Sequence, residues 1–338
     1  MHRGEIPAEQ DYKRRKAARI GRKVPMKKYF VSMLIVTLLL TAIVPTVALG
    51  SASGRLMVYS ALPAPQLDLM VAMFNEKYPG ITVDVFSANS ADVFARVQAE
   101  GSVTGGLVLG GNLESFRAVQ DLFTSYTTAN AKNFHAQYAA VESAAFTPIQ
   151  LHVSALVVNK DAAKKLGVKV TGWDSLKNES LTGRVAYMNP AASSPVSEQA
   201  AFVNNFARTI NVASPSAPSF VLNAVTAGQY AVGIVNEEKA IERQKSGANI
   251  EVVYAAEGVA MGASYAGILA GAENEAAKLF LDFITGREYQ QAAADTLNQR
   301  SVRRDVDFGL KGIVATNSLK ALDSRSIAML TGLQVAAK

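Results

Sequence analysis

The fold is decided by residues 55–86, RLMVYSALPAPQLDLMVAMFNEKYPGITVDVF. The apolar run at 55–59 predicts a strand, and apolar residues at helical spacing after Pro65 predict a helix that starts with proline in its first turn. Pro79 and Gly80 end this helix, and the run at 81–86 predicts a second strand. A strand, a helix and a strand in this order predict two parallel strands of one sheet.

The same alternation continues to the end of the chain. Further strands are predicted at 107–109, 154–159, 183–187, 230–235 and 265–269, and further helices at 113–122, 161–167, 196–210, 240–245 and 275–284. Such repeats predict an α/β protein with an open parallel sheet covered by helices on both faces.

Composition narrows the class of protein. The chain has 338 residues, of which 49% are hydrophobic, and it contains no Cys and three His. The length suits two lobes of roughly 120–170 residues each. Without Cys there can be no disulfide and no thiolate ligand, and three His leave little room for a multi-histidine centre. We expect no cofactor and no metal centre.

The positive charge is confined to the N-terminus. Residues 1–28 hold ten Lys/Arg and three Asp/Glu, a net charge of +7, whereas the whole chain carries +6, so the remainder carries −1. The rest of the chain therefore has no excess of positive charge that would indicate a basic nucleic-acid-binding surface, and we expect no nucleic-acid partner.

An uncharged apolar run follows this basic stretch at 29–50 and ends in small residues. This layout is typical of a secretory signal, and Pro45 with the polar sequence beyond it favours cleavage. An uncleaved membrane anchor is the alternative, because about 20 apolar residues can cross a bilayer. We assign 1–52 to the basic extension and signal, and expect the working part to lie outside the cytoplasm.

Several motifs carry a family resemblance. In order, they are VYSA at 58–61, FNEKYPGI at 74–81, GG at 110–111, LVVN at 156–159, GWDSL at 172–176, GRVA at 183–186 with NPAAS at 189–193, VTAGQYAVG at 225–233, EAAKLFLDF at 275–283 and RSVRRDV at 300–306. This series resembles the solute-binding proteins of ABC importers, in the branch that binds ferric ion, phosphonates and phosphorylated solutes.

The resemblance implies a two-lobed fold of the type II periplasmic binding proteins, in which each lobe is an open mixed sheet flanked by helices. Lobe one would comprise 55–152 and 266–300, and lobe two 158–262 and 310–336, joined by hinge crossovers near 153–157 and 263–266. The protein would be a periplasmic monomer without enzymatic activity. It would close on a small anion, deliver it to the transmembrane subunits of an ABC permease, and meet the membrane itself only through the signal segment.

The iron-binding members carry adjacent tyrosines after the strand that here ends at Asn236. This chain has Glu237 and Glu238 there instead. Carboxylates are also hard ligands for ferric ion, so a ferric-binding protein remains the alternative, although its signature is missing. We expect Glu237 to bind an ammonium or hydroxyl group of the solute, and Glu238 and Lys239 to be solvated.

Small and polar residues recur where predicted strands lead into helices. The candidate ligand-binding residues are Ser60, Asn89, Ser90, Gly111, Asn112, Ser193 and Ser194, with Tyr265 added at the second crossover. Helix N-termini present free N–H groups and the positive end of the helix dipole, so several that converge favour an anion. The alternative for each residue is an ordinary N-cap.

Other residues are expected to be structural. We expect His152 to pack at the hinge, Trp173 to pack in a core, and Arg300 and Arg303 to form surface ion pairs. No nucleophile elbow, Walker A loop or HExxH motif is present. A secreted enzyme acting on a phosphorylated or sugar substrate is nevertheless a second alternative, and a signalling sensor would require an uncleaved anchor.

Overall fold

The computed structural model describes residues 53–101, 106–139, 144–187, 198–210, 212, 218–271, 275–306 and 313–332. The chain divides into two units, 1–50 and 51–338, and all of these residues belong to the second. The expected signal at 1–52 lies outside the described residues. Within the ranges given above, no helix combines the length and the apolarity that a membrane span requires.

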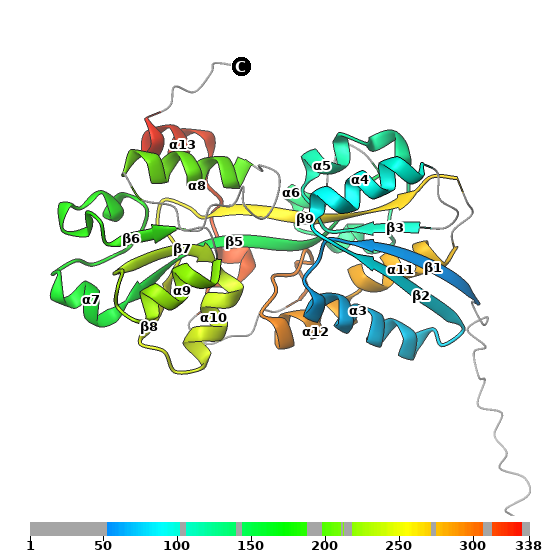
Figure 1. The fold of residues 1–338 in the computed structure, drawn as a ribbon, viewed down its shortest axis with the longest axis horizontal. Coiled ribbons are helices and arrows are strands. Elements are labelled where there is room, and N and C mark those ends of the chain that lie inside the picture. Colours follow the sequence, from blue (N-terminus) through cyan, green and yellow to red (C-terminus); the bar gives the residue numbers. More distant parts are fainter. Residues whose placement is uncertain are drawn as a thin grey trace, which may run out of the picture. The chain divides into compact units, whose positions relative to one another are not determined.

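The first part of the chain alternates strands and helices as predicted (Figure 1). Its elements are β1 (Gly54–Ser60), α3 (Ala64–Lys77), β2 (Ile81–Ser87), α4 (Ser90–Glu100), β3 (Gly106–Leu109), α5 (Leu113–Arg117), η1 (Gln120–Leu122), β4 (Phe123–Thr124), η2 (Ala131–Asn133) and α6 (Ala136–Ala139). Pro65 lies in the first turn of α3, where the proline ring needs no N–H partner.

The middle of the chain contains the longest strand, β5 (Thr147–Asn159), and the elements that follow it. These are α7 (Lys160–Lys165), η3 (Asp174–Lys177), η4 (Glu179–Leu181), β6 (Val185–Tyr187), α8 (Glu198–Thr209), α9 (Pro218–Thr226), β7 (Val232–Asn236), α10 (Glu237–Lys245) and β8 (Ile250–Val253). The last elements are β9 (Ala260–Leu269), α11 (Glu275–Thr285), α12 (Arg287–Leu297), η6 (Thr316–Ser318) and α13 (Ser324–Thr331).

The strands form a mixed sheet in the order β2-β1-β3-β9-β5-β7-β6. Strand β1 is parallel to β2 and β3, and β6 is parallel to β7. Strands β5 and β9 are antiparallel to each other and to their other neighbours. Hydrogen bonding is therefore continuous through these two long strands, which connect the β1–β3 end of the sheet to the β6–β8 end.

Each end of the sheet has its own hydrophobic core. The first core packs α3, α11 and α12 against β1 and β3, and includes Phe74, Leu107 and Phe280. The second core surrounds β7, with Trp173 and Phe206 on one face and the residues of α9 and α10 on the other. Trp173 is fully buried in edge-on contact with Phe206, which confirms its packing role.

Some elements differ from the prediction. The helix expected at 113–122 is interrupted, because Val119 between α5 and η1 leaves the helical conformation, with φ −133° and ψ 31°. Helix α10 begins directly at Glu237 instead of after a loop at 236–238. Strand β5 starts seven residues before the predicted run at 154–159.

Candidate functional site

The carboxyl ends of β1, β2 and β3 lie side by side. In the strand register Ser60 faces Ser87 on one side and Leu109 on the other. Beyond the strands, Ala61 N–H donates to Leu109 O at 2.8 Å, and Ala88 N–H donates to Ser60 O at 3.1 Å. The loops that carry Ser60, Asn89, Ser90, Gly111 and Asn112 therefore meet, and we call these five residues the β1–β3 edge.

Two glycines connect this edge to β9. Gly110 and Gly111 have φ values of +86° and +96°, which L side chains rarely adopt. Gly110 N–H donates to Tyr265 O at 2.9 Å, and Tyr265 N–H donates to Gly111 O at 3.1 Å. The side chain of Tyr265 packs in an aromatic cluster around Phe116, where burial raises the pKa of its hydroxyl to about 12.

Three residues of the edge use their side chains to bind the backbone. Asn89 Oδ1 accepts from Asp92 N–H at 3.0 Å at the start of α4, and Asn112 Oδ1 accepts from Ser115 N–H at 2.9 Å at the start of α5. Ser60 Oγ accepts from Leu62 N–H at 3.1 Å. The side-chain oxygens of Asn89 and Asn112 therefore act as N-caps of α4 and α5.

Ser90 differs from these three. It is the first residue of α4 and is 8% exposed, yet its hydroxyl has no hydrogen-bond partner among the described residues. A Cβ placed on Gly111 would lie 3.4 Å from Ser90 Oγ, so this hydroxyl faces the glycine loop. A buried donor at a helix N-terminus is an arrangement that suits an anion. Ser193 and Ser194 lie outside the described residues.

Glu237 is not placed as expected. It is 1% exposed, and its carboxylate accepts from Arg300 Nη2 at 2.9 Å, from Arg300 Nε and from the Tyr254 hydroxyl at 2.6 Å. Burial raises the pKa of the Glu237 carboxyl, although the hydrogen bonds from Arg300 and Tyr254 oppose that shift. The carboxylate is thus occupied within the protein, which is a correction to its expected role in binding the solute.

The two arginines also differ from the expectation. Arg300 and Arg303 do form ion pairs, with Glu237 and with Asp305, but their side chains are 0% and 4% exposed. They are buried instead of lying on the surface, because other parts of the chain cover them and supply further partners, Glu237 for Arg300 and Asn130 with Thr285 for Arg303. The motif itself contains Asp305, the ion-pair partner of Arg303, but its spacing carries no signal of the distant Glu237 that pairs with Arg300.

Glu238 reaches the crossover strands. Gln150 Nε2 donates to its Oε1 at 2.6 Å, and His152 Nδ1 lies 3.6 Å from the same oxygen. On the other side, His152 Nε2 shares a hydrogen bond of 2.7 Å with Ser264 Oγ. His152 thus packs between β5 and β9, as expected. The Glu238 side chain is 23% exposed and has partners, so it is less solvated than predicted.

A separate small cavity of about 110 Å³ opens beside the start of β5. Aromatic rings and threonines line it, among them Tyr126, Thr128, Tyr138 and Phe146. None of the predicted ligand residues lies on its wall. Across the described ranges, no three His, Asp or Glu side chains gather closely enough to hold a metal ion.

Comparison with solved structures shows the fold. AfuA from Actinobacillus pleuropneumoniae, with exogenous fructose-6-phosphate bound, is 21% identical with a TM-score of 0.64, over 83% of this chain and 97% of that one. The apo ferric ion-binding protein A of Pasteurella haemolytica is 17% identical with a TM-score of 0.65, over 83% and 95%. A two-component system protein that mediates signal transduction is 18% identical with a TM-score of 0.68, over 81% and 96%. These likenesses confirm the two-lobed fold of periplasmic binding proteins.

Sequence comparison identifies the family. No curated protein is significantly similar to the chain. Residues 56–296, which include every strand from β2 to β9, match the bacterial extracellular solute-binding proteins. The match agrees with the resemblance carried by the sequence motifs and with the fold. The chain belongs to the family of bacterial extracellular solute-binding proteins.

Proposed function

We propose that this protein captures a small anionic solute outside the cytoplasm and delivers it to an ABC permease, with a phosphonate or a phosphate ester as the favoured ligand. Membership of the solute-binding family supports the binding role. The observation that carries the ligand class is the buried hydroxyl of Ser90, without a hydrogen-bond partner among the described residues, at the N-terminus of α4.

The chemistry of the β1–β3 edge favours an anion over a cation. The first N–H groups of α4 have no partner within the helix, and the helix dipole places positive charge at the same point. Gly111 is needed beside this helix start, since a Cβ there would strike the Phe94 ring. N–H groups and hydroxyls donate to phosphoryl oxygens, and the N–H groups cannot ligate a metal.

The proposal includes three further residues, Ser193, Ser194 and Glu238. Ser193 and Ser194 are proposed as donors to the anion. Glu238 replaces Glu237 as the proposed acceptor for an ammonium or hydroxyl group of the solute, because its carboxylate is partly exposed and that of Glu237 is buried in an ion pair.

The proposed lobes are 55–152 with 266–300, and 158–262 with 310–336. The two hydrophobic cores support this division, since the first includes residues of β1 and α11 and the second residues of β7 and α13. Burying a polar solute between two such faces requires motion of β5 and β9.

Titration calorimetry on the purified protein tests the proposal, with 2-aminoethylphosphonate, glucose 6-phosphate, inorganic phosphate and ferric citrate as probes. We expect one of the phosphorus compounds to bind, and Ser193→Ala to weaken that binding by about 1–3 kcal/mol. Ser246→Ala, at the exposed end of α10, is the matched control and should leave affinity unchanged. Binding of ferric citrate with no response to any phosphorus compound would favour the ferric alternative. Turnover of the ester would instead indicate an enzyme.

A further inference from the structure

Residues 300–303 of the RSVRRDV motif form an irregular segment whose polar contacts reach both cores. After α12, Arg300 O accepts from Leu151 N–H at 3.0 Å, which pairs the segment with β5. Val302 O accepts from His135 N–H at 2.9 Å, and the backbones of Arg303 and Phe134 form an isolated antiparallel β-bridge. The backbone of this segment is therefore held in place along its length.

The side chain of Arg300 binds the second core. It is fully buried and donates to Glu237, the first residue of α10, as an ion pair. It also donates to the Tyr254 hydroxyl at 3.2 Å, just after β8, and to Thr316 Oγ1 at 3.1 Å in the segment that leads to α13. All three partners belong to elements at the β6–β8 end of the sheet.

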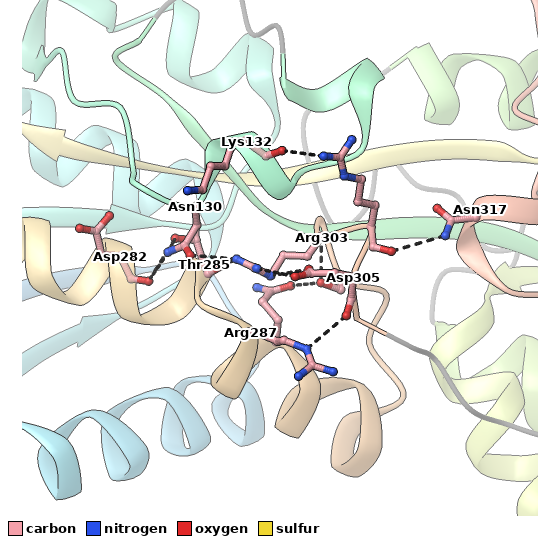
Figure 2. Close-up of polar contacts among 11 residues, drawn as sticks. Asn130, Lys132, Asp282, Thr285, Arg287, Arg303, Asp305 and Asn317 are labelled. Carbon is pink, nitrogen blue, oxygen red and sulfur yellow. Dashed lines mark hydrogen bonds and ion pairs between the residues drawn. The ribbon is translucent and has the colours of Figure 1, made fainter.

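The side chain of Arg303 binds the first core. Its Nη1 donates to Asn130 Oδ1 at 2.9 Å and to Thr285 O at 3.1 Å, at the end of α11. Asp305 accepts from its Nε and Nη2 at 2.9 and 2.8 Å. Asn130 in turn donates to Asp282 O at 2.8 Å, so the contact is continuous with α11, as Figure 2 shows.

Between the arginines, the segment is bound to α12. Ser301 Oγ donates to Gln290 Oε1 at 2.6 Å, and Val302 N–H donates to the same oxygen at 3.3 Å. Gln290 Nε2 then donates to Ile149 O of β5 at 2.9 Å. Every one of these polar groups is buried, so none can leave its partner without becoming unpaired.

We propose that residues 300–303, here called the two-arginine segment, fix how far the two cores can move relative to each other. Arg300 and Arg303 are positioning residues that hold opposite cores across three peptide units. A buried guanidinium cannot be withdrawn from its partners without leaving an unpaired charge, so motion between the cores must keep both sets of contacts. The inference goes beyond the proposed function, because neither arginine needs to touch the solute.

Distance measurements between the cores test this without any solute, so the result does not depend on the ligand assignment. The chain has no Cys, and Asp68→Cys on α3 with Lys164→Cys on α7 therefore gives one clean pair of spin labels on exposed sites. We expect Arg300→Gln and Arg303→Gln each to broaden the distance distribution by roughly twofold in double electron–electron resonance. Arg304→Gln, the same change at the exposed neighbour, is the control and should leave it unchanged.

A second set of variants covers the case in which a single substitution does not fold. The double variant R300Q/E237Q replaces the buried ion pair by two neutral amides, and Asn130→Ala removes one acceptor of Arg303 without leaving a bare charge. Both should broaden the distribution more than R304Q does. Distributions that match R304Q in every folded variant would overturn the proposal, whatever solute the protein binds.

Discussion

Glu237, the first residue of α10, shares a buried ion pair with Arg300, which lies 63 residues further along the chain. The two side chains are 1% and 0% exposed, and the Tyr254 hydroxyl completes the carboxylate's hydrogen bonds. Because this pair fixes the start of α10, the next residue, Glu238, is held toward Gln150 on β5. One of the two adjacent glutamates is thus structural, and the other lies at the crossover.

Removal of the Glu237 charge should strongly destabilise the protein. In Glu237→Gln the guanidinium of Arg300 stays buried without a counter-charge, so we expect a loss of about 3–5 kcal/mol in the free energy of unfolding. Urea denaturation measures the loss. Glu242→Gln on the same helix is the control: its partner is Lys239, both side chains are exposed, and the loss should stay below about 1 kcal/mol. Equal losses in the two variants would contradict the prediction.

Gly111 should tolerate a side chain much less well than Gly101. Both have positive φ, at +96° and +67°, but a Cβ on Gly111 would lie 2.8 Å from Phe94 Cε2, whereas a Cβ on Gly101 meets nothing within 4 Å. Gly101→Ala should therefore cost about 1 kcal/mol for its backbone conformation alone, and Gly111→Ala about 1–3 kcal/mol. Thermal unfolding of the two variants compares them, and a larger loss in G101A would show that Phe94 moves aside freely.

The elements predicted well from sequence are those whose residues interact within one repeat. Strand β1, helix α3 and strand β2 were predicted from apolar spacing and from Pro79 and Gly80. In the structure, the bounds of the two strands differ from the prediction by at most one residue at each end. For Asn89 and Asn112 we predicted ligand binding, with an N-cap as the alternative. Local sequence supports that alternative, because a cap binds backbone three residues away, and both side-chain oxygens do cap their helices.

The partners of charged residues could not be predicted in the same way. Arg300 binds Glu237, 63 positions away, and Arg303 binds Asn130, 173 positions away, as well as Asp305 within its own motif. The spacing of RSVRRDV places Asp305 near Arg303 but does not indicate the two distant partners. The start of α10 was missed for a related reason. Glu237 and Glu238 read as a polar loop, although acidic residues in the first turn are favoured by the helix dipole.

Acid should weaken the contact between Arg303 and Asp305. The hydrogen bonds from Arg303 hold the pKa of the Asp305 carboxyl below its usual value, so its ionised form is favoured in the folded state. This contribution is complete above the usual aspartate pKa and is lost as pH falls through the lowered one. Unfolding measured from pH 7 to about pH 3 should therefore show a steeper loss for the parent than for Asp305→Asn. Asp121→Asn, an exposed aspartate on η1, should leave the slope unchanged.

Loss of the Ser60 hydroxyl should mainly lower stability, whereas loss of the Ser90 hydroxyl should mainly weaken solute binding. Ser60 Oγ accepts from the buried N–H of Leu62, so Ser60→Ala leaves that N–H unpaired and should lower the free energy of unfolding by about 1–3 kcal/mol. Ser90 Oγ has no partner among the described residues, so Ser90→Ala should change stability by less than about 0.5 kcal/mol. In calorimetry with the phosphorus compound that the parent binds, S90A should nevertheless lose about 1–3 kcal/mol of affinity, because its hydroxyl is the donor left for the anion. Parent-like affinity in a folded S90A would remove Ser90 from the site and would leave the backbone N–H groups of α4 as the donors at this edge.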